Sequence, residues 1–279
     1  MHRYTRWSAV RELGFWLAAI PLLLPLYLVV ATALKPASEG TRSSFSPPSQ
    51  PTLDNVSTAW EAAGGDTVSF AQAMLNSVVT TVVVVLLLIA LAAPAAYALA
   101  RRGSRLSAVV FGIFSLGLIL PVQLGVIPLY AFMVEIGLAG TRAGLILVYT
   151  GVLMPLAIFL YAGFFRGLTC SYEEAARVDG ARPLRVFAEI VFPLVKPATG
   201  VVAVLTGLFV WNDFFLALVF VGGTDKVTLP VAVYSFVGRF SVQWPLVFAS
   251  ALIALGPVLL AYGLMQRSIM KGFSTTLRG

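Results

Sequence analysis

Residues 171–197, SYEEAARVDGARPLRVFAEIVFPLVKP, form the most highly charged stretch of an otherwise apolar chain and lie between two apolar segments that are each long enough to cross a bilayer. Ser171 precedes Glu174 by three positions, which is the spacing of a capping box at the start of a helix. Gly180 can adopt the left-handed backbone conformation that ends a helix. These residues predict a short helix that starts near Tyr172 and stops at Gly180.

A second helix is predicted directly after the first. Pro183 suits the first position of a helix, and Arg185 and Glu189 lie four residues apart on one polar face. Apolar side chains recur at helical spacing on the other face, at Leu184, Phe187, Ile190 and Val191. Two short helices joined at Gly180 suit docking into another protein, although an ordinary surface loop explains the same pattern.

The composition indicates an integral membrane protein of the all-α class. Of the 279 residues, 59% are hydrophobic and 11% are charged, which leaves too few polar groups to cover a soluble protein of this size. A bilayer core about 30 Å thick requires roughly 20 apolar residues in a helix. Windows of that length predict six transmembrane helices, at residues 13–34, 73–100, 106–134, 143–165, 198–221 and 246–265.

The distribution of lysine and arginine predicts the orientation. With the N-terminus in the cytoplasm, the cytoplasmic segments carry fourteen of the 19 Lys and Arg residues and the other side carries five. Both termini and residues 171–197 are therefore expected in the cytoplasm. This asymmetry accounts for the net charge of +7, which gives no ground for nucleic-acid binding. The first apolar run is longer than the core of a usual signal peptide, and we interpret it as a retained helix rather than a cleaved signal.

Residue types that carry catalysis are scarce. Cys170 is the only cysteine and His2 the only histidine, which leaves no intramolecular disulfide and no His/Cys metal cluster. The sequence has no G-x-x-x-x-G-K-[ST] phosphate-binding loop, so the chain cannot bind ATP in that way. A nucleophile elbow is also absent from the sequence. We expect no catalysis and no cofactor in this chain.

A few polar residues within the apolar segments have two interpretations. Asp213 is the one acidic residue well inside such a segment. A carboxylate in a membrane marks a functional site by default, but an aspartate also caps breaks in helices. Tyr149 and Tyr161 would either offer rings to a sugar or lie at the membrane interfaces.

Prolines and loops complete the predicted organisation. Pro121 and Pro128 predict kinks within a single third span, and Pro94 predicts one in the second. The 35–70 loop is rich in Pro, Ser, Gly and Thr and either contacts an external partner or serves as a tether, with a short helix near 56–63. Residues 231–240 are expected to form an extracytoplasmic or re-entrant helix.

The 171–197 stretch resembles the signature of the permease subunits of binding-protein-dependent ABC importers. That signature is Glu-Ala-Ala, three residues, Gly, nine residues, Ile, one residue and Leu-Pro. Residues that fit it in register are Glu174, Ala175, Ala176, Gly180, Ile190 and Pro193, with Asp179 and Ala181 beside the glycine. Phe192 stands where the family usually has Leu, and the change keeps an apolar side chain.

Shorter matches extend the resemblance from about residue 76 to the C-terminus. They are Asn76-Ser77 at the predicted start of the second span, AYALAR at 96–101, IPLY at 127–130, GFFR at 163–166 and WNDF at 211–214. In combination they resemble the oligosaccharide-uptake branch, and within it the second, maltose-type permease.

The resemblance implies a heteromeric ABC transporter in the cell membrane. This chain would pair with a homologous second permease, above two ATPase subunits that bind ATP and magnesium and below an extracytoplasmic substrate-binding protein. The resemblance assigns coupling to the ATPase to Glu173, Glu174, Ala175, Ala176, Asp179, Gly180, Ala181, Phe187, Ile190 and Pro193. Our candidates for the translocation path are Gln123, Tyr130, Asn212 and Asp213.

The predicted domains follow from these assignments. Residues 1–72 would hold a cytoplasmic tail, the first helix and an extracytoplasmic loop; residues 73–267 the importer transmembrane domain; and residues 268–279 a cytoplasmic tail. The function that we expect is carbohydrate uptake driven by separate ATPases. An ion-coupled secondary transporter that uses Asp213 is the alternative, and a membrane-embedded enzyme lacks the residues it needs.

Overall fold

The computed structural model describes residues 6–36, 39, 45–61, 68–237 and 242–276. Throughout these residues the regular secondary structure is helical, apart from one isolated antiparallel bridge between Val237 and Val242. The all-α class predicted from the sequence is therefore confirmed. The chain forms two compact units, one of residues 1–71 and 232–259 and the other of residues 72–231 and 260–279.

The first unit is built around the loop between its first two helices, α1 (Arg6–Ala33) and α2 (Asp54–Glu61). Asn55 is buried at the start of α2, and its amide nitrogen donates to the carbonyl oxygens of Ala33, at 2.8 Å, and Lys35, at 2.7 Å. The short helix predicted near 56–63 is thus present, two residues earlier. The second half of α12 (Leu229–Tyr234) and the first half of α13 (Trp244–Thr276) belong to this unit, whose buried cluster is Ala33, Ala59, Phe236 and Ala249.

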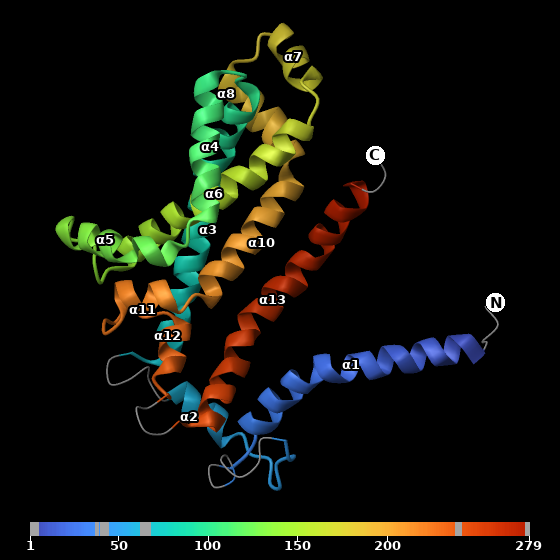
Figure 1. Cartoon of the computed structure of the whole chain (residues 1–279), viewed down its shortest axis with the longest axis vertical. Coiled ribbons are helices and arrows are strands. Elements are labelled where there is room, and N and C mark those ends of the chain that lie inside the picture. The colour runs from blue at the N-terminus through green and yellow to red at the C-terminus, as the bar shows by residue number, and fades with distance from the viewer. Residues whose placement is uncertain (1–5, 37–38, 40–44, 62–67, 238–241, 277–279) are drawn as a thin grey trace. The chain divides into compact units, whose positions relative to one another are not determined.

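The second unit is organised around α6 (Arg142–Gly167), which packs against α4 (Arg105–Ile119), α10 (Lys196–Asn212) and α11 (Phe215–Val221). Its small and aromatic side chains fill the core, including the fully buried Tyr149, Ala157, Tyr161 and Phe165. The long helix α3 (Phe70–Arg101) lies in the same unit and is continuous through Pro94. Figure 1 shows α7 (Ser171–Val178) and α8 (Pro183–Arg185) at one end of this unit and α11 at the other.

Among the described residues, three helices are long and apolar enough to cross a membrane: Gly14–Ala33 within α1, all of α3 and all of α6. Two bent helix pairs raise the number of candidate spans to five, and Trp244–Leu260 is a shorter apolar helix. The prediction of six membrane-spanning helices therefore stays a prediction.

The third predicted span is not one kinked helix. It is two helices, α4 and α5 (Val122–Glu135), that meet at 105° across Leu120 and Pro121 (Figure 1). Proline lacks the N–H group that a helix needs and drives the preceding residue toward extended geometry, and Leu120 is extended, with φ −73° and ψ 125°. Pro121 thus ends one helix, whereas Pro128 lies inside α5.

Three further helix boundaries correct the sequence predictions. The second span begins at Phe70 rather than at Asn76-Ser77, which lie inside α3. The fifth predicted span, residues 198–221, is divided into α10 and α11 by Asp213 and Phe214. The expected helix at 231–240 is the shorter α12, and residues 238–241 lie outside the described part of the chain.

Candidate functional site

The first helix of the charged stretch, α7, starts one residue earlier than the capping box predicts. Its N-cap is Cys170, which makes no side-chain cap bond, and Ser171 is its first helical residue. The carbonyl oxygen of Cys170 accepts from the backbone N–H groups of Glu173, at 2.9 Å, and Glu174, at 3.0 Å. The capping box is therefore a wrong prediction, because Cys170 is already in helical geometry, with φ −72° and ψ −13°.

The end of α7 matches the sequence prediction. Gly180 has φ +81°, in the left-handed region that glycine adopts without steric cost. The N–H of Gly180 donates to the carbonyl oxygen of Arg177 and that of Ala181 to Ala176, both at 3.0 Å. This pair of bonds is the Schellman motif, which satisfies the last carbonyl groups of a helix and turns the chain sharply.

The second helix is wider than an α-helix over the middle half of its length. It opens at Pro183 in α8, continues as the π-helix η1 (Val186–Val191) and closes in α9 (Phe192–Leu194). The predicted ion pair is present, with Arg185 Nε 2.8 Å from Glu189 Oε2 on the exposed side.

The wider turn of η1 changes which side chains face the interior. Val186 and Val191 are buried, whereas Leu184, predicted on the apolar face, is 77% exposed. The i→i+5 bonding of a π-helix adds a residue to the turn, so the apolar positions drift away from the 3.6-residue spacing used in the prediction.

The two adjacent acids of α7 lie in different environments. Glu174 is exposed, but the Glu173 side chain is 5% exposed and points back into the chain. Glu173 Oε1 accepts from Arg101 Nε at 2.7 Å, and its Oε2 accepts from the Tyr97 hydroxyl at 2.8 Å. The sequence grouped Glu173 with the residues that meet an ATPase, and the structure gives its carboxylate partners within this chain instead.

An aromatic cluster lies beneath the two short helices. The ring of Tyr97 lies 5.5 Å from that of Phe165 and 5.2 Å from that of Phe187, and Phe187 is 5.8 Å from Phe192. Phe187 is therefore an inward anchor of η1. The substitution of Phe for the family's usual Leu at position 192 adds a ring to this cluster.

The outward face of α7 combines acidic and apolar side chains. Tyr172 is 56% exposed and Val178 is 87% exposed, and Glu174, Ala175 and Asp179 are exposed beside them. Of the remaining predicted coupling residues, Gly180 is exposed and Ala176 is buried; half-buried are Ala181, Phe187, Ile190 and Pro193. We call Tyr172, Glu174, Ala175, Val178 and Asp179 the docking face, after the docking role that the sequence predicts for residues 171–197.

Asp213 caps the break between α10 and α11. Its Oδ2 accepts from the backbone N–H of Leu216 at 2.9 Å and of Ala217 at 3.3 Å, and from the Tyr149 hydroxyl at 2.9 Å. The capping interpretation of Asp213 thus has direct geometric support. Tyr149 and Tyr161 are both fully buried and hydrogen-bonded within the chain, Tyr161 to Thr199 at 3.1 Å, which leaves neither ring open to a sugar.

Of the other candidate path residues, Tyr130 and Asn212 have contacts of their own. Gln123 is exposed on α5, and Tyr130 packs its ring 5.6 Å from that of Phe220. Asn212 is exposed and donates to the carbonyl oxygen of Leu208, at 2.8 Å, in its own helix. No hydrogen bond in the described part of the chain joins Gln123, Tyr130 or Asn212 to Asp213, and their place on a translocation path stays a prediction.

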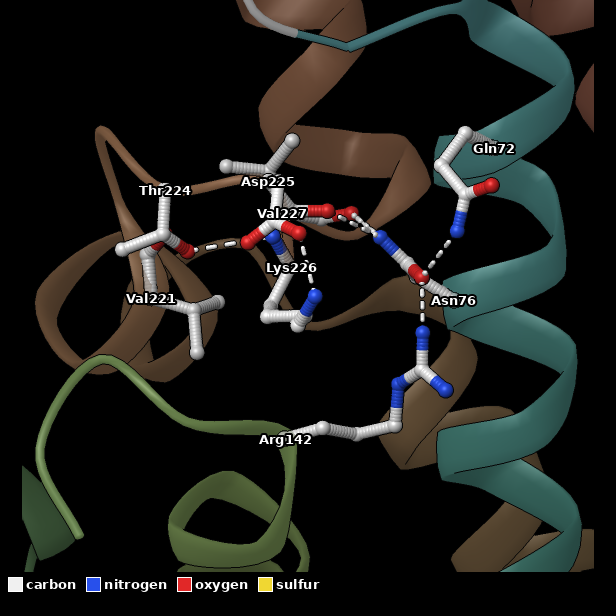
Figure 2. Close-up of polar contacts among 8 residues, drawn as sticks. All are labelled: Gln72, Asn76, Arg142, Val221, Thr224, Asp225, Lys226 and Val227. Carbon is white, nitrogen blue, oxygen red and sulfur yellow. Dashed lines mark hydrogen bonds and ion pairs between the residues drawn. The ribbon is translucent and has the colours of Figure 1, made fainter.

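A second polar cluster holds the loop between α11 and α12 (Figure 2). The amide nitrogen of Asn76 donates to the carbonyl oxygens of Asp225, at 3.0 Å, and Val227, at 2.9 Å, while its Oδ1 accepts from Gln72 and Arg142. The next residue, Ser77, accepts from the N–H of Leu229 at 2.7 Å.

We call Asn76 and the residues bonded to it the loop clamp. The sequence drew attention to Asn76-Ser77 only as a family motif at a helix start and assigned no role to Arg142. Within the loop, Lys226 forms an ion pair with Asp225, and its hydrogen bond lowers the pKa of that carboxyl group.

Comparisons with known proteins identify the family to which this chain is similar. Residues 88–273 match the family model described as binding-protein-dependent transport system inner membrane component. The chain is 35% identical over 253 residues to the melibiose/raffinose/stachyose import permease protein MelC of Bacillus subtilis, covering 90% of both chains. It is 32% identical over 275 residues to the trehalose transport system permease protein SugB of Mycobacterium tuberculosis, covering 98% of this chain and 97% of SugB.

A solved structure shares the fold. It is a chain of a bacterial ABC transporter involved in the import of the acidic polysaccharide alginate, with a TM-score of 0.77 at 22% identity, covering 96% of this chain and 99% of that one. The helical fold and the sequence matches together define a membrane permease subunit. The chain belongs to the family of inner membrane components of binding-protein-dependent transport systems.

Proposed function

We propose that this chain is the permease subunit of an ATP-driven carbohydrate importer, in which the docking face of α7 binds a separate ATPase. The proposal rests on the family match and on relatives whose names specify sugar transport. The observation that carries it is the docking face itself, an acidic and apolar surface that is exposed among the residues that the structure describes.

The docking face has the chemistry of a protein interface. Tyr172 and Val178 supply apolar area, and Glu174 and Asp179 supply carboxylates for basic groups on the partner. The small Ala175 lets a partner surface approach the backbone closely. An exposed apolar patch rimmed by charge is the usual mark of a protein–protein contact.

The remaining partners follow from the family. We infer a homologous second permease that completes the translocation path, a second ATPase subunit, and a substrate-binding protein on the far side of the membrane. The excess of Lys and Arg on the segments that include α7 supports a cytoplasmic docking face and cytoplasmic termini. ATP and magnesium would be bound by the ATPase subunits, so this chain would not be an enzyme.

Nucleotide would act on this chain through a two-state change. When ATP draws the ATPases together, each docked helix moves with its ATPase, and the membrane helices change between inward-facing and outward-facing arrangements. The role of this chain is then to transmit a movement and to form half of the path.

An ion-coupled mechanism has little support in the geometry. Such a mechanism would need Asp213 to bind and release a cation or a proton, but Asp213 Oδ2 already accepts from two backbone N–H groups and from a tyrosine hydroxyl. These bonds explain the residue as a helix cap, and family membership points to ATP as the energy source.

Uptake in proteoliposomes that contain the whole complex tests the proposal. We expect sugar uptake that requires ATP and the loaded binding protein and that persists when an ionophore dissipates the ion gradients. A matched complex with an ATPase subunit that cannot hydrolyse ATP should show none. Uptake that survives loss of hydrolysis and collapses with the ionophore would instead establish the ion-coupled alternative.

A further inference from the structure

The short helix α7 packs against η1 but buries few of its own side chains. It has eight residues, and Glu173 and Ala176 are its buried residues. Helices of this length are marginal in isolation, so the orientation of α7 has to come from its attachments to the rest of the unit. Ala176 offers one methyl group, which leaves the carboxylate of Glu173 as the directional attachment.

Both oxygens of that carboxylate are bonded to α3. Arg101 Nε and the Tyr97 hydroxyl lie one turn apart at the end of α3 and each donate to one Glu173 oxygen, at 2.7 and 2.8 Å. Arg177 Nη2, on α7 itself, lies 3.8 Å from Glu173 Oε2. Charge-assisted bonds of this kind are short and directional, so they fix the angle of α7 and not only its proximity.

Arg101 also reaches a third helix. Its Nη2 donates at 3.1 Å to the carbonyl oxygen of Leu168, the C-cap residue of α6. The guanidinium therefore joins the last turn of α3, the end of α6 and the first turn of α7. A displacement of α7 would pull on both long helices through one side chain.

We propose that Tyr97, Arg101 and Glu173 form a latch that sets the orientation of α7 and transmits its movement to α3 and α6. Glu173 is then a positioning residue that faces inward, and contact with the ATPase falls to the docking face. The inference rests on the proposed docking of α7 to an ATPase. It goes beyond that proposal by naming the residues through which movement of the docked α7 reaches α3 and α6.

The latch predicts a specific pattern of uncoupling in the assembled complex. Glu173→Gln would remove the negative charge that strengthens both bonds, and Arg101→Gln would lose the link to Leu168. We expect each variant to assemble and hydrolyse ATP but to import about tenfold less sugar per ATP hydrolysed. Arg102→Gln is the matched control, because Arg102 is exposed at the next position and should keep the normal ratio.

Reversal of the charges separates a latch from a contact with the ATPase. The double variant Arg101→Glu/Glu173→Arg restores an ion pair within this chain, and we expect it to import more sugar per ATP than either Glu173→Arg or Arg101→Glu alone. If those single variants fail to assemble, restored assembly of the double variant supports the latch equally. A double variant no better than the singles, or single Gln variants with a normal ratio, would overturn the latch.

A cross-link keeps this test separate from that of the proposed function. The variant Val178→Cys, on the docking face, should cross-link to the ATPase in a complex whose latch residues are unchanged. If that cross-link forms while the latch variants transport normally, the latch is wrong and docking stands. If the Val178→Cys cross-link does not form in the complex with unchanged latch residues, the docking proposal fails and the latch fails with it.

Discussion

Residues of the same chemical type have different structural roles in this chain, as two neighbouring glutamates show. Glu173 and Glu174 are adjacent acids in the first turn of one helix, yet one is buried against α3 and the other is exposed. The partner that decides the difference, Arg101, lies 72 positions away in sequence. Helical spacing within 171–197 therefore could not have separated the inward acid from the outward one.

At Asp213 we predict that stability and sugar uptake depend on the hydrogen-bond acceptor of the side chain and not on its negative charge. Asp213→Asn keeps a side-chain oxygen that can cap α11, so sugar uptake should stay within about twofold of normal, whereas Asp213→Ala loses a cap worth about 1 kcal/mol. Thermal unfolding of the purified complex and uptake would be measured together. A well-folded Asp213→Asn complex without uptake would show that the carboxylate itself acts in transport.

At Gly180 we predict that a β-branched residue uncouples the transporter. No atom lies within 4 Å of a Cβ built at this position, so Gly180→Val meets no clash, and its cost is the left-handed backbone at φ +81°, about 1–2 kcal/mol. Relief of that strain would open the Schellman turn and rotate α7. We expect normal membrane insertion with reduced uptake per ATP hydrolysed.

Gly103→Val is the matched control for Gly180→Val. Gly103 also has open space around it and lies in a connection between helices, but its backbone is not left-handed. Equal uptake per ATP in the two variants would contradict a special role for the Gly180 turn.

At the scale of elements, the sequence indicated where helices lie better than how they break. Apolar length located α3 and α6, and Gly180 and Pro183 marked the end of α7 and the start of α8. The 105° break at Pro121 was predicted only as a kink, because a proline shows that a helix is interrupted but not the angle at which the chain leaves. The π-helical turn of η1 has no sequence signal of its own, so the exposure of Leu184 was not foreseen.

The loop clamp should hold the connection between α11 and α12 in one conformation. Asn76→Ala removes two bonds to that loop and leaves Arg142 and Gln72 without their shared acceptor, which should cost about 1–3 kcal/mol. We expect faster proteolytic cleavage within residues 222–228 in the variant complex. Asn212→Ala is the matched control, since that exposed amide bonds only to its own helix in the contacts that the structure describes, and its cleavage rate should be normal. Equal rates in the two variants would refute the clamp.

At the scale of the whole molecule, the features assigned to function occupy opposite ends of one long helix. Asn76 in the loop clamp and Arg101 in the latch lie 25 residues apart on α3, about 38 Å at 1.5 Å per residue. This arrangement suits a subunit that relays movement between a partner on each side of a membrane. The substrate class comes from the relatives and not from the geometry of this chain.

The central claim is that the exposed face of α7 binds the ATPase. Cys170 is a free, exposed cysteine, so cross-linking would use a Cys170→Ser background with Val178→Cys on the docking face. Leu124→Cys, on α5, is the matched control, because Leu124 is 77% exposed and Val178 is 87% exposed. With the complete transporter in membranes, we predict a cross-linked product between this chain and the ATPase from Val178→Cys and none from Leu124→Cys. No product from Val178→Cys in an assembled transporter, or equal product from both positions, would contradict the account.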